Sequence, residues 1–174
     1  MTARRLAPAH AATLVSVRAF LRWSDRIFLG IAGLLSAGFL VSISLQVLFR
    51  YVLELPLPWT EELSRYMFVW AALIAAAVSV GRNDQFVIPI LYDHLPAAVQ
   101  RALDILIQLL ALAFAAIMVW YGFQMADRLM MAGSPVLPIP QGTVYLVIPI
   151  AGLYMAVHIL GRLAARIVGG DSAW

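Results

Sequence analysis

Four long runs of uncharged, largely apolar residues constrain the fold of this chain more than any other feature. They cover residues 27–49, 66–81, 105–126 and 143–161. A bilayer core of about 30 Å requires about 20 residues of α-helix, since each residue rises about 1.5 Å. The first, third and fourth runs are long enough alone, and the second becomes long enough when residues 60–65 extend it. The pattern predicts an all-α, polytopic membrane protein with four transmembrane helices, folded as a single domain over residues 1–174.

The segments between the runs define the expected boundaries. A short apolar stretch at 86–92, interrupted by Pro89 and followed by Pro96, cannot cross a bilayer. We expect this segment between the second and third helices to lie in the membrane interface or to tuck between helices. Three prolines within 130–141 predict an ordered, non-helical connection, and Pro149 predicts a kink in the last helix. The expected spans cover about residues 27–49, 60–81, 102–126 and 143–162.

The segment before the first span is basic. Residues 1–13 are predicted to form a flexible tail, and residues 14–26 a short amphipathic helix, because Arg18, Arg22 and Arg26 recur every fourth residue. A basic flank without a defined helical face is an open alternative. A signal peptide is disfavoured, because the apolar run that follows is longer than a usual signal-peptide core.

Small residues predict close helix contacts in the first span. Gly33 with Ala37, and Gly38 with Ser42, are pairs of small residues four positions apart. Such pairs allow the backbone of a neighbouring membrane helix to approach closely. We interpret them as packing positions.

The composition excludes several classes of function. There is no cysteine, and all 12 basic residues are arginine, so cysteine-ligated metals, a phosphate-binding P-loop lysine and a Schiff-base lysine are excluded. The histidines His10, His94 and His158 lack the spacing of a metal or haem site, and His158 is expected to be an interfacial side chain. We therefore predict no enzyme activity and no cofactor, and a membrane redox enzyme is disfavoured.

The arginines instead indicate the topology. The net charge of +3 does not predict nucleic-acid binding, because the arginines flank the apolar runs rather than cluster on one soluble face. With both termini in the cytoplasm, nine arginines fall in cytoplasmic segments and three, Arg50, Arg65 and Arg128, fall outside. The positive-inside rule therefore predicts cytoplasmic N- and C-termini.

Residues 49–70 contain the only concentrated polar chemistry between apolar runs. Thr60 is expected to cap the second helix, with Glu61 and Glu62 in its first turn. Arg65 lies four residues after Glu61 and three after Glu62, so it can pair with either carboxylate. The segment is interpreted either as an interfacial salt bridge that fixes the corner between two helices, or as such a corner that also docks a partner. We expect the loss of Arg65 to weaken an assembly more than the loss of Arg50, because Arg65 lies deeper.

The same segment resembles a known family. The residues Phe49-Arg50-Tyr51, Pro58-Trp59-Thr60-Glu61-Glu62-Leu63, Arg65-Tyr66 and Trp70 are similar in order and spacing to the small, DctQ-type membrane subunit of tripartite ATP-independent periplasmic (TRAP) transporters. One departure follows the second helix. Gly81 leads into Arg82-Asn83-Asp84 where the family often has a histidine.

The resemblance implies a function and a set of partners. It implies that this chain is a scaffold for a large multi-pass TRAP permease subunit in an ion-gradient-driven uptake system. It also implies that this chain contributes to docking of a periplasmic solute-binding receptor. Membrane lipids of the bacterial inner membrane are the remaining expected partners. The residues expected to serve structure and assembly are Arg50, Tyr51, Pro58, Trp59, Glu61, Glu62, Arg65 and Trp70.

A self-contained exporter or channel is the alternative function. Such a protein, working as a homo-oligomer, requires an ionisable group within the membrane, and Asp104 near the start of the third span is the one fair candidate. The middles of the four runs otherwise offer serines, glycines and Pro149. The sequence therefore favours a membrane subunit that does not itself hold a transport site.

Overall fold

The computed structural model describes residues 8–55, 57–82 and 95–167, and the side chains of 21–55, 57–82, 95–96 and 98–164. The described part is helical, apart from its connections. The helices are α1 (Pro8–Tyr51), α2 (Pro58–Arg82), α4 (Ala97–Leu129), α5 (Gln141–Tyr145) and α6 (Val147–Ile167). The expected interfacial segment at 86–92 lies outside the described residues.

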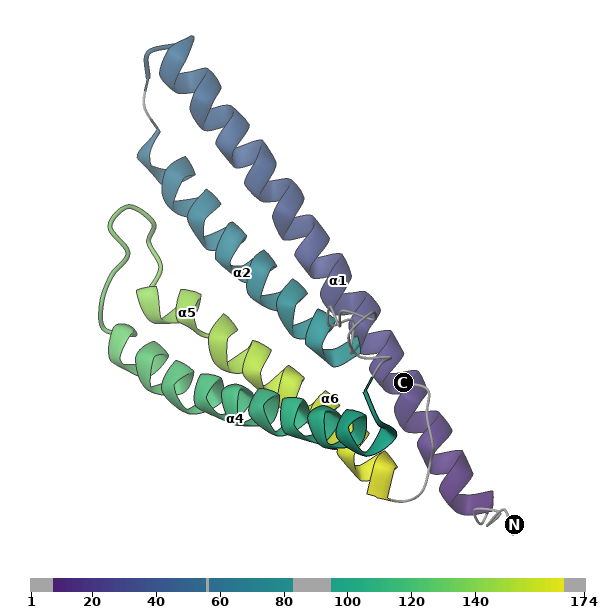
Figure 1. The fold of residues 1–174 in the computed structure, drawn as a ribbon. Helices are drawn as coiled ribbons and strands as arrows, with labels where there is room; N and C mark the ends of the chain where they lie inside the picture. Colours follow the sequence, from purple (N-terminus) through teal and green to yellow (C-terminus); the bar gives the residue numbers. More distant parts are fainter. Residues whose placement is uncertain (1–7, 56, 83–94, 168–174) are drawn as a thin grey trace.

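The helices form two antiparallel pairs that meet at one end (Figure 1). α1 packs along α2, α4 packs along α5 and α6, and α2 contacts α6 between the pairs. Toward the other end the pairs diverge. We call this the corner end; it holds the α1–α2 connection and the α4–α5 connection (130–140). The opposite end, where α2 and α6 finish, is called the terminal end.

Four helical stretches of the described chain are long and apolar enough to cross a membrane. They are Leu21–Tyr51, Pro58–Arg82, Ala98–Leu129 and Gln141–Ala164, with mean hydropathies from 1.7 to 2.4. Each of the four expected spans lies within one of these stretches. The prediction of an all-α protein with four membrane-spanning helices is confirmed.

The N-terminal half of α1 differs from the expectation of a separate short helix. Residues 14–26 are helical, but they continue without a break into the first span, and the helix already begins at Pro8, within the expected tail. No proline or glycine interrupts residues 9–29, and arginine is a strong helix former. A helix of 44 residues is about 66 Å long, so α1 extends well beyond a bilayer core of about 30 Å.

The core lies where α2 crosses α6, with α4 behind it. Ala77 and Val78 of α2 pack with Ala151 and Ile159 of α6, and all four are almost fully buried. α4 approaches through a small-residue contact, because a side-chain carbon on Gly152 would lie 2.9 Å from a backbone oxygen of α4. The small side chains of this core allow the close helix packing that membrane proteins use.

The last span is broken near its N-terminal end. α5 ends at Tyr145, and α6 begins at Val147. Pro149 has no N–H to donate to the carbonyl of Tyr145, four residues earlier, so the α-helical ladder is interrupted there. The chain turns at Leu146, whose N–H donates to the Thr143 carbonyl at 3.4 Å. The helix is thus broken three residues before the proline that predicts a kink, and the proline ring lies against Gly122 of α4.

The two small-residue pairs of α1 have different environments. Gly38 contacts Met67 of α2, and the Ser42 hydroxyl donates to the Thr60 carbonyl at 3.0 Å, so this pair packs as expected. Gly33 and Ala37 are instead exposed, and a carbon added at Gly33 would meet no atom within 4 Å. The Gly33–Ala37 pair therefore has no helix packed against it within the described chain.

Candidate functional site

The corner site begins at the N-terminus of α2. The helix starts at Pro58 rather than near Thr60, because proline is favoured in the first turn, where an N–H is not needed. Thr60 is therefore not the N-cap that the sequence predicts. Its hydroxyl donates back to the Leu57 carbonyl at 2.7 Å, and its side chain is fully buried. With Ser42 bonded to its carbonyl, Thr60 fixes α2 against α1.

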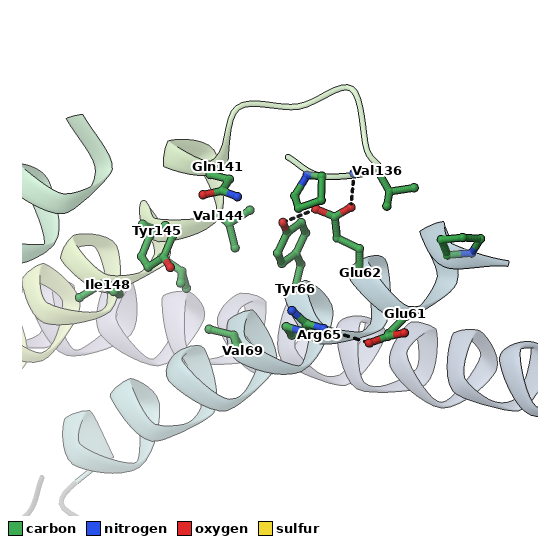
Figure 2. Close-up of a pocket in the computed structure, with 13 residues that line it drawn as sticks. Glu61, Glu62, Arg65, Tyr66, Val69, Val136, Gln141, Val144, Tyr145 and Ile148 are labelled. Carbon is green, nitrogen blue, oxygen red and sulfur yellow. Dashed lines mark hydrogen bonds and ion pairs between the residues drawn. The ribbon is translucent and has the colours of Figure 1, made fainter. Parts of the chain in front are cut away.

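Glu62 anchors the α4–α5 connection to α2 (Figure 2). Its Oε2 accepts the backbone N–H groups of Val136 at 2.9 Å and Leu137 at 3.0 Å. Its Oε1 accepts the hydroxyls of Tyr66, at 2.5 Å, and Ser134. A buried carboxylate requires such a set of donors, and Glu62 is only 7% exposed. These hydrogen bonds fasten the connection to the start of α2 at the corner end.

Arg65 pairs with Glu61 and not with Glu62. Its Nη2 lies 3.1 Å from Glu61 Oε1, and the two side chains are 66% and 60% exposed. An ion pair of Arg65 with one of the two predicted carboxylates is therefore present, and both side chains are exposed on the described chain. An exposed pair of this spacing stabilises a helix by about 0.3–0.5 kcal/mol. The pair therefore contributes surface charge more than stability.

A hollow of about 450 Å³ separates α2 from α5 at the corner end. Figure 2 shows Tyr66, Arg65 and Val69 of α2 on one side, with Gln141 and Tyr145 of α5 on the other. Its lining combines apolar side chains with the Glu61–Arg65 pair at the edge. The hollow exists because the two helix pairs diverge here while the Glu62 contacts hold the connection in place.

The other expected residues of the corner divide into two groups. Trp70 points inward, and its Nε1 donates to the Val144 carbonyl at 3.0 Å. Arg50, Tyr51 and Trp59 are exposed, with the Arg50 guanidinium 5.9 Å from the centre of the Tyr51 ring. The structure therefore brings Glu62 and Trp70 into contacts between the helix pairs. It leaves Arg50, Tyr51 and Trp59 on the surface.

The sequence interpretation missed a polar cluster at the terminal end. Asp25 of α1 is buried, and it accepts the Tyr154 hydroxyl of α6. The carboxylate lies 3.4 Å from Arg82 Nε of α2 and 3.3 Å from His158 Nε2 of α6. His158 is thus 6% exposed and between helices, which corrects its interpretation as an interfacial side chain. This terminal cluster joins α1, α2 and α6.

Neighbouring contacts reinforce the terminal cluster. The Arg162 guanidinium donates to the Gly81 carbonyl at 2.5 Å, and the ring of Phe28 stacks on that of Tyr154 with centroids 4.5 Å apart. A signal was present in the sequence. Asp25 shares a helical face with Phe28 and Ala32, so the carboxylate had to face the same core as those apolar residues.

Metal chemistry receives no support from the described side chains. Among them no three histidine, aspartate or glutamate residues are grouped as a metal site would require. Asp25 and His158 are near one another, but their other neighbours are Tyr154 and Arg82. A tyrosine hydroxyl and a guanidinium are suited to hold a carboxylate in place rather than to complete a metal site.

Comparison with known proteins identifies the class of this four-helix membrane protein. A family model described as "Tripartite ATP-independent periplasmic transporters, DctQ component" matches residues 39–169. The match covers most of the chain and includes both the corner site and α6. The chain therefore belongs to the DctQ family and is a multi-pass membrane subunit of a TRAP transporter.

Three relatives illustrate the similarity. The chain is 29% identical over 145 residues to the isethionate TRAP transporter permease protein DctMQ of Oleidesulfovibrio alaskensis, covering 79% of this chain and 22% of that protein. It is 27% identical to a putative TRAP transporter small permease protein of Haemophilus influenzae, covering 73% and 79%. It is 25% identical to the sialic acid TRAP transporter small permease protein SiaQ of Vibrio cholerae, covering 74% and 75%. The chain thus matches most of each small permease, but about a fifth of the DctMQ protein.

Proposed function

We propose that this chain is the scaffold subunit of a TRAP-type, ion-gradient-driven solute uptake system in a bacterial inner membrane. In this proposal it binds a large multi-pass permease subunit through its helix faces. Its corner end contributes to docking of a periplasmic solute-binding receptor. The nine-to-three distribution of arginines supports cytoplasmic termini and a periplasmic corner end.

The observation that supports the scaffold role is the exposure of two whole helix faces. In the most apolar stretches of α1 and α4, only 11% of the residues are buried, against 44% in the last span. Leu34 of α1 is 76% exposed and Trp120 of α4 is 67% exposed. Lipid can cover such faces, but the exposed Gly33 and Ala37 also suit the backbone of another helix.

The length of the DctMQ relative supports the same proposal. The matching segment makes up 22% of that permease protein, so in that relative a segment similar to this chain is joined to a much longer permease chain. This supports a close association between this chain and a large permease subunit.

Receptor docking is supported by the surface of the corner end. Arg50, Glu61 and Arg65 are exposed there, and they present both signs of charge on the α1–α2 pair. Beside them, Glu62 holds the connection that carries Pro135 and Val136. A surface fixed in this way loses little conformational freedom when a partner binds.

Co-purification tests the proposal. The chain is expressed with a large TRAP permease subunit of the same organism, and the pair is purified in mild detergent through a tag on this chain. We expect the large subunit to co-elute, and the immobilised pair to retain the receptor. Arg50→Glu should weaken receptor retention and leave the large subunit bound. A chain that elutes alone, under conditions in which it remains folded, would contradict the scaffold role.

A further inference from the structure

A second hollow, of about 410 Å³, lies between α1 and α2 near the corner end. We call it the α1–α2 hollow. Arg50 of α1 and Arg65 of α2 line its polar part, and Phe39, Ile43 and Phe68 line its apolar part. It is separate from the hollow between α2 and α5, although Glu61 and Arg65 contribute to both.

Polarity changes along the α1–α2 hollow in one direction. Phe39 and Ile43 lie about three and two helical turns before Arg50, and Phe68 lies about one turn after Arg65. Because α1 and α2 are antiparallel, both displacements run from the corner end toward the middle of the membrane. The rings of Phe39 and Phe68 are 5.4 Å apart and form one apolar surface. The hollow is therefore cationic at the membrane surface and apolar at greater depth.

The charge of the hollow is not balanced within the described chain. Arg65 pairs with Glu61 through one nitrogen, and a guanidinium has five N–H donors in all. Arg50 forms no ion pair with any described residue. Two guanidinium groups thus face one carboxylate, and the hollow has a net positive charge. An anionic group that reaches both arginines would complement it.

We propose that the α1–α2 hollow binds one phospholipid from the leaflet at the corner end. The phosphate accepts hydrogen bonds from Arg50 and Arg65, and an acyl chain covers Phe39, Ile43 and Phe68. Free phosphate satisfies the arginines but leaves the apolar surface uncovered. A phospholipid satisfies both parts, and its own polarity changes with depth in the same direction as that of the hollow.

Native mass spectrometry of the full chain in detergent tests the proposal, with neither a large subunit nor a receptor present. The inference goes beyond the proposed function, and either can fail without the other. Phosphatidylglycerol, diacylglycerol and inorganic phosphate are titrated separately into the wild type, Arg50→Gln and Arg128→Gln. Arg128 is the matched control, because it is an exposed arginine at the same end of the protein but lies on α4.

We expect one phosphatidylglycerol to bind the wild type and the Arg128→Gln variant equally, and Arg50→Gln to bind it about fivefold more weakly. Diacylglycerol and inorganic phosphate should both bind at least fivefold more weakly than phosphatidylglycerol. Ile43→Asn changes the apolar part of the hollow and leaves its charged residues unchanged, and this variant should also bind phosphatidylglycerol more weakly than the wild type. Equal binding of phosphatidylglycerol by the Arg50→Gln and Arg128→Gln variants would overturn the proposal. So would diacylglycerol or inorganic phosphate binding as tightly as phosphatidylglycerol.

Discussion

The carboxylate of Glu62 accepts the backbone N–H of Val136 at 2.9 Å, although the two residues are 74 positions apart. This hydrogen bond and the one from the Leu137 N–H to the same carboxylate join the start of α2 to the connection between α4 and α5. The two helix pairs are therefore fastened at the corner end, where they otherwise diverge, as well as at the terminal cluster.

Replacing Glu62 with Gln should destabilise the chain by about 2 kcal/mol. The amide of Gln retains one acceptor oxygen. Its NH₂ group replaces the other oxygen and would face N–H or O–H groups whose hydrogen bonds the carboxylate now accepts. Unfolding in mixed micelles measures the loss, and hydrogen exchange at Val136 and Leu137 should become faster. Glu61→Gln is the control, with an expected effect below about 0.5 kcal/mol, because its ion pair is exposed. Equal effects of the two variants would contradict the anchoring role of Glu62.

Replacing Asp25 with Asn should destabilise the chain by about 3 kcal/mol. The change removes the only carboxylate charge of the terminal cluster among the described groups, and leaves buried donors without an anionic partner. Asp127→Asn at the exposed end of α4 is the control and should be nearly neutral. The same unfolding measurement compares them. A neutral Asp25→Asn variant would show that the terminal cluster does not hold α1 in place.

Gly33→Leu and Gly122→Leu should differ in what they disrupt. Gly33 has no atom within 4 Å of an added carbon, so the isolated chain should keep its stability while co-purification of the large subunit weakens. An added carbon at Gly122 would lie 2.7 Å from the ring of Pro149, so that variant should lose chain stability itself. Thermal unfolding and co-purification are measured for both. Unchanged co-purification of Gly33→Leu would remove this face of α1 from the proposed interface.

Arg65→Ala should change the stability of the chain by less than about 0.5 kcal/mol. The side chain is 66% exposed, and its removal leaves Glu61 in a position where it remains solvated. Arg50→Ala should have a similarly small effect on the unfolding of the isolated chain. A loss of more than about 2 kcal/mol for Arg65→Ala alone would mean that the pair supports the fold of the corner.

The sequence predicted the features that depend on local patterns. Uncharged runs identified all four spans, and Pro149 predicted an irregularity in the last span, which the structure breaks at Leu146. The spacing of Arg65 predicted a pair with Glu61 or Glu62, and the structure forms the pair with Glu61. The order of residues from Phe49 to Trp70 identified the family. Each of these signals lies within one segment, so no knowledge of tertiary contacts was required.

The features that the sequence did not predict depend on contacts between distant segments. The spacing of Glu62 allowed a pair with Arg65, but backbone N–H groups 74 and 75 residues away provided a better set of donors. In the sequence Asp25 lies within a basic flank, and its partners Tyr154 and His158 are more than 120 residues away, so local spacing does not connect them. Thr60 resembles a cap, so the sequence predicts that α2 begins near this residue, whereas the helix begins at Pro58.

Solute uptake into proteoliposomes tests the central claim most directly. Vesicles are reconstituted with a large TRAP permease subunit, with or without this chain, and are supplied with a solute-loaded receptor and an inward sodium gradient. The scaffold role predicts uptake only when this chain is present, and loss of uptake when the receptor or the gradient is omitted. Full uptake by the large subunit and receptor without this chain would contradict the account.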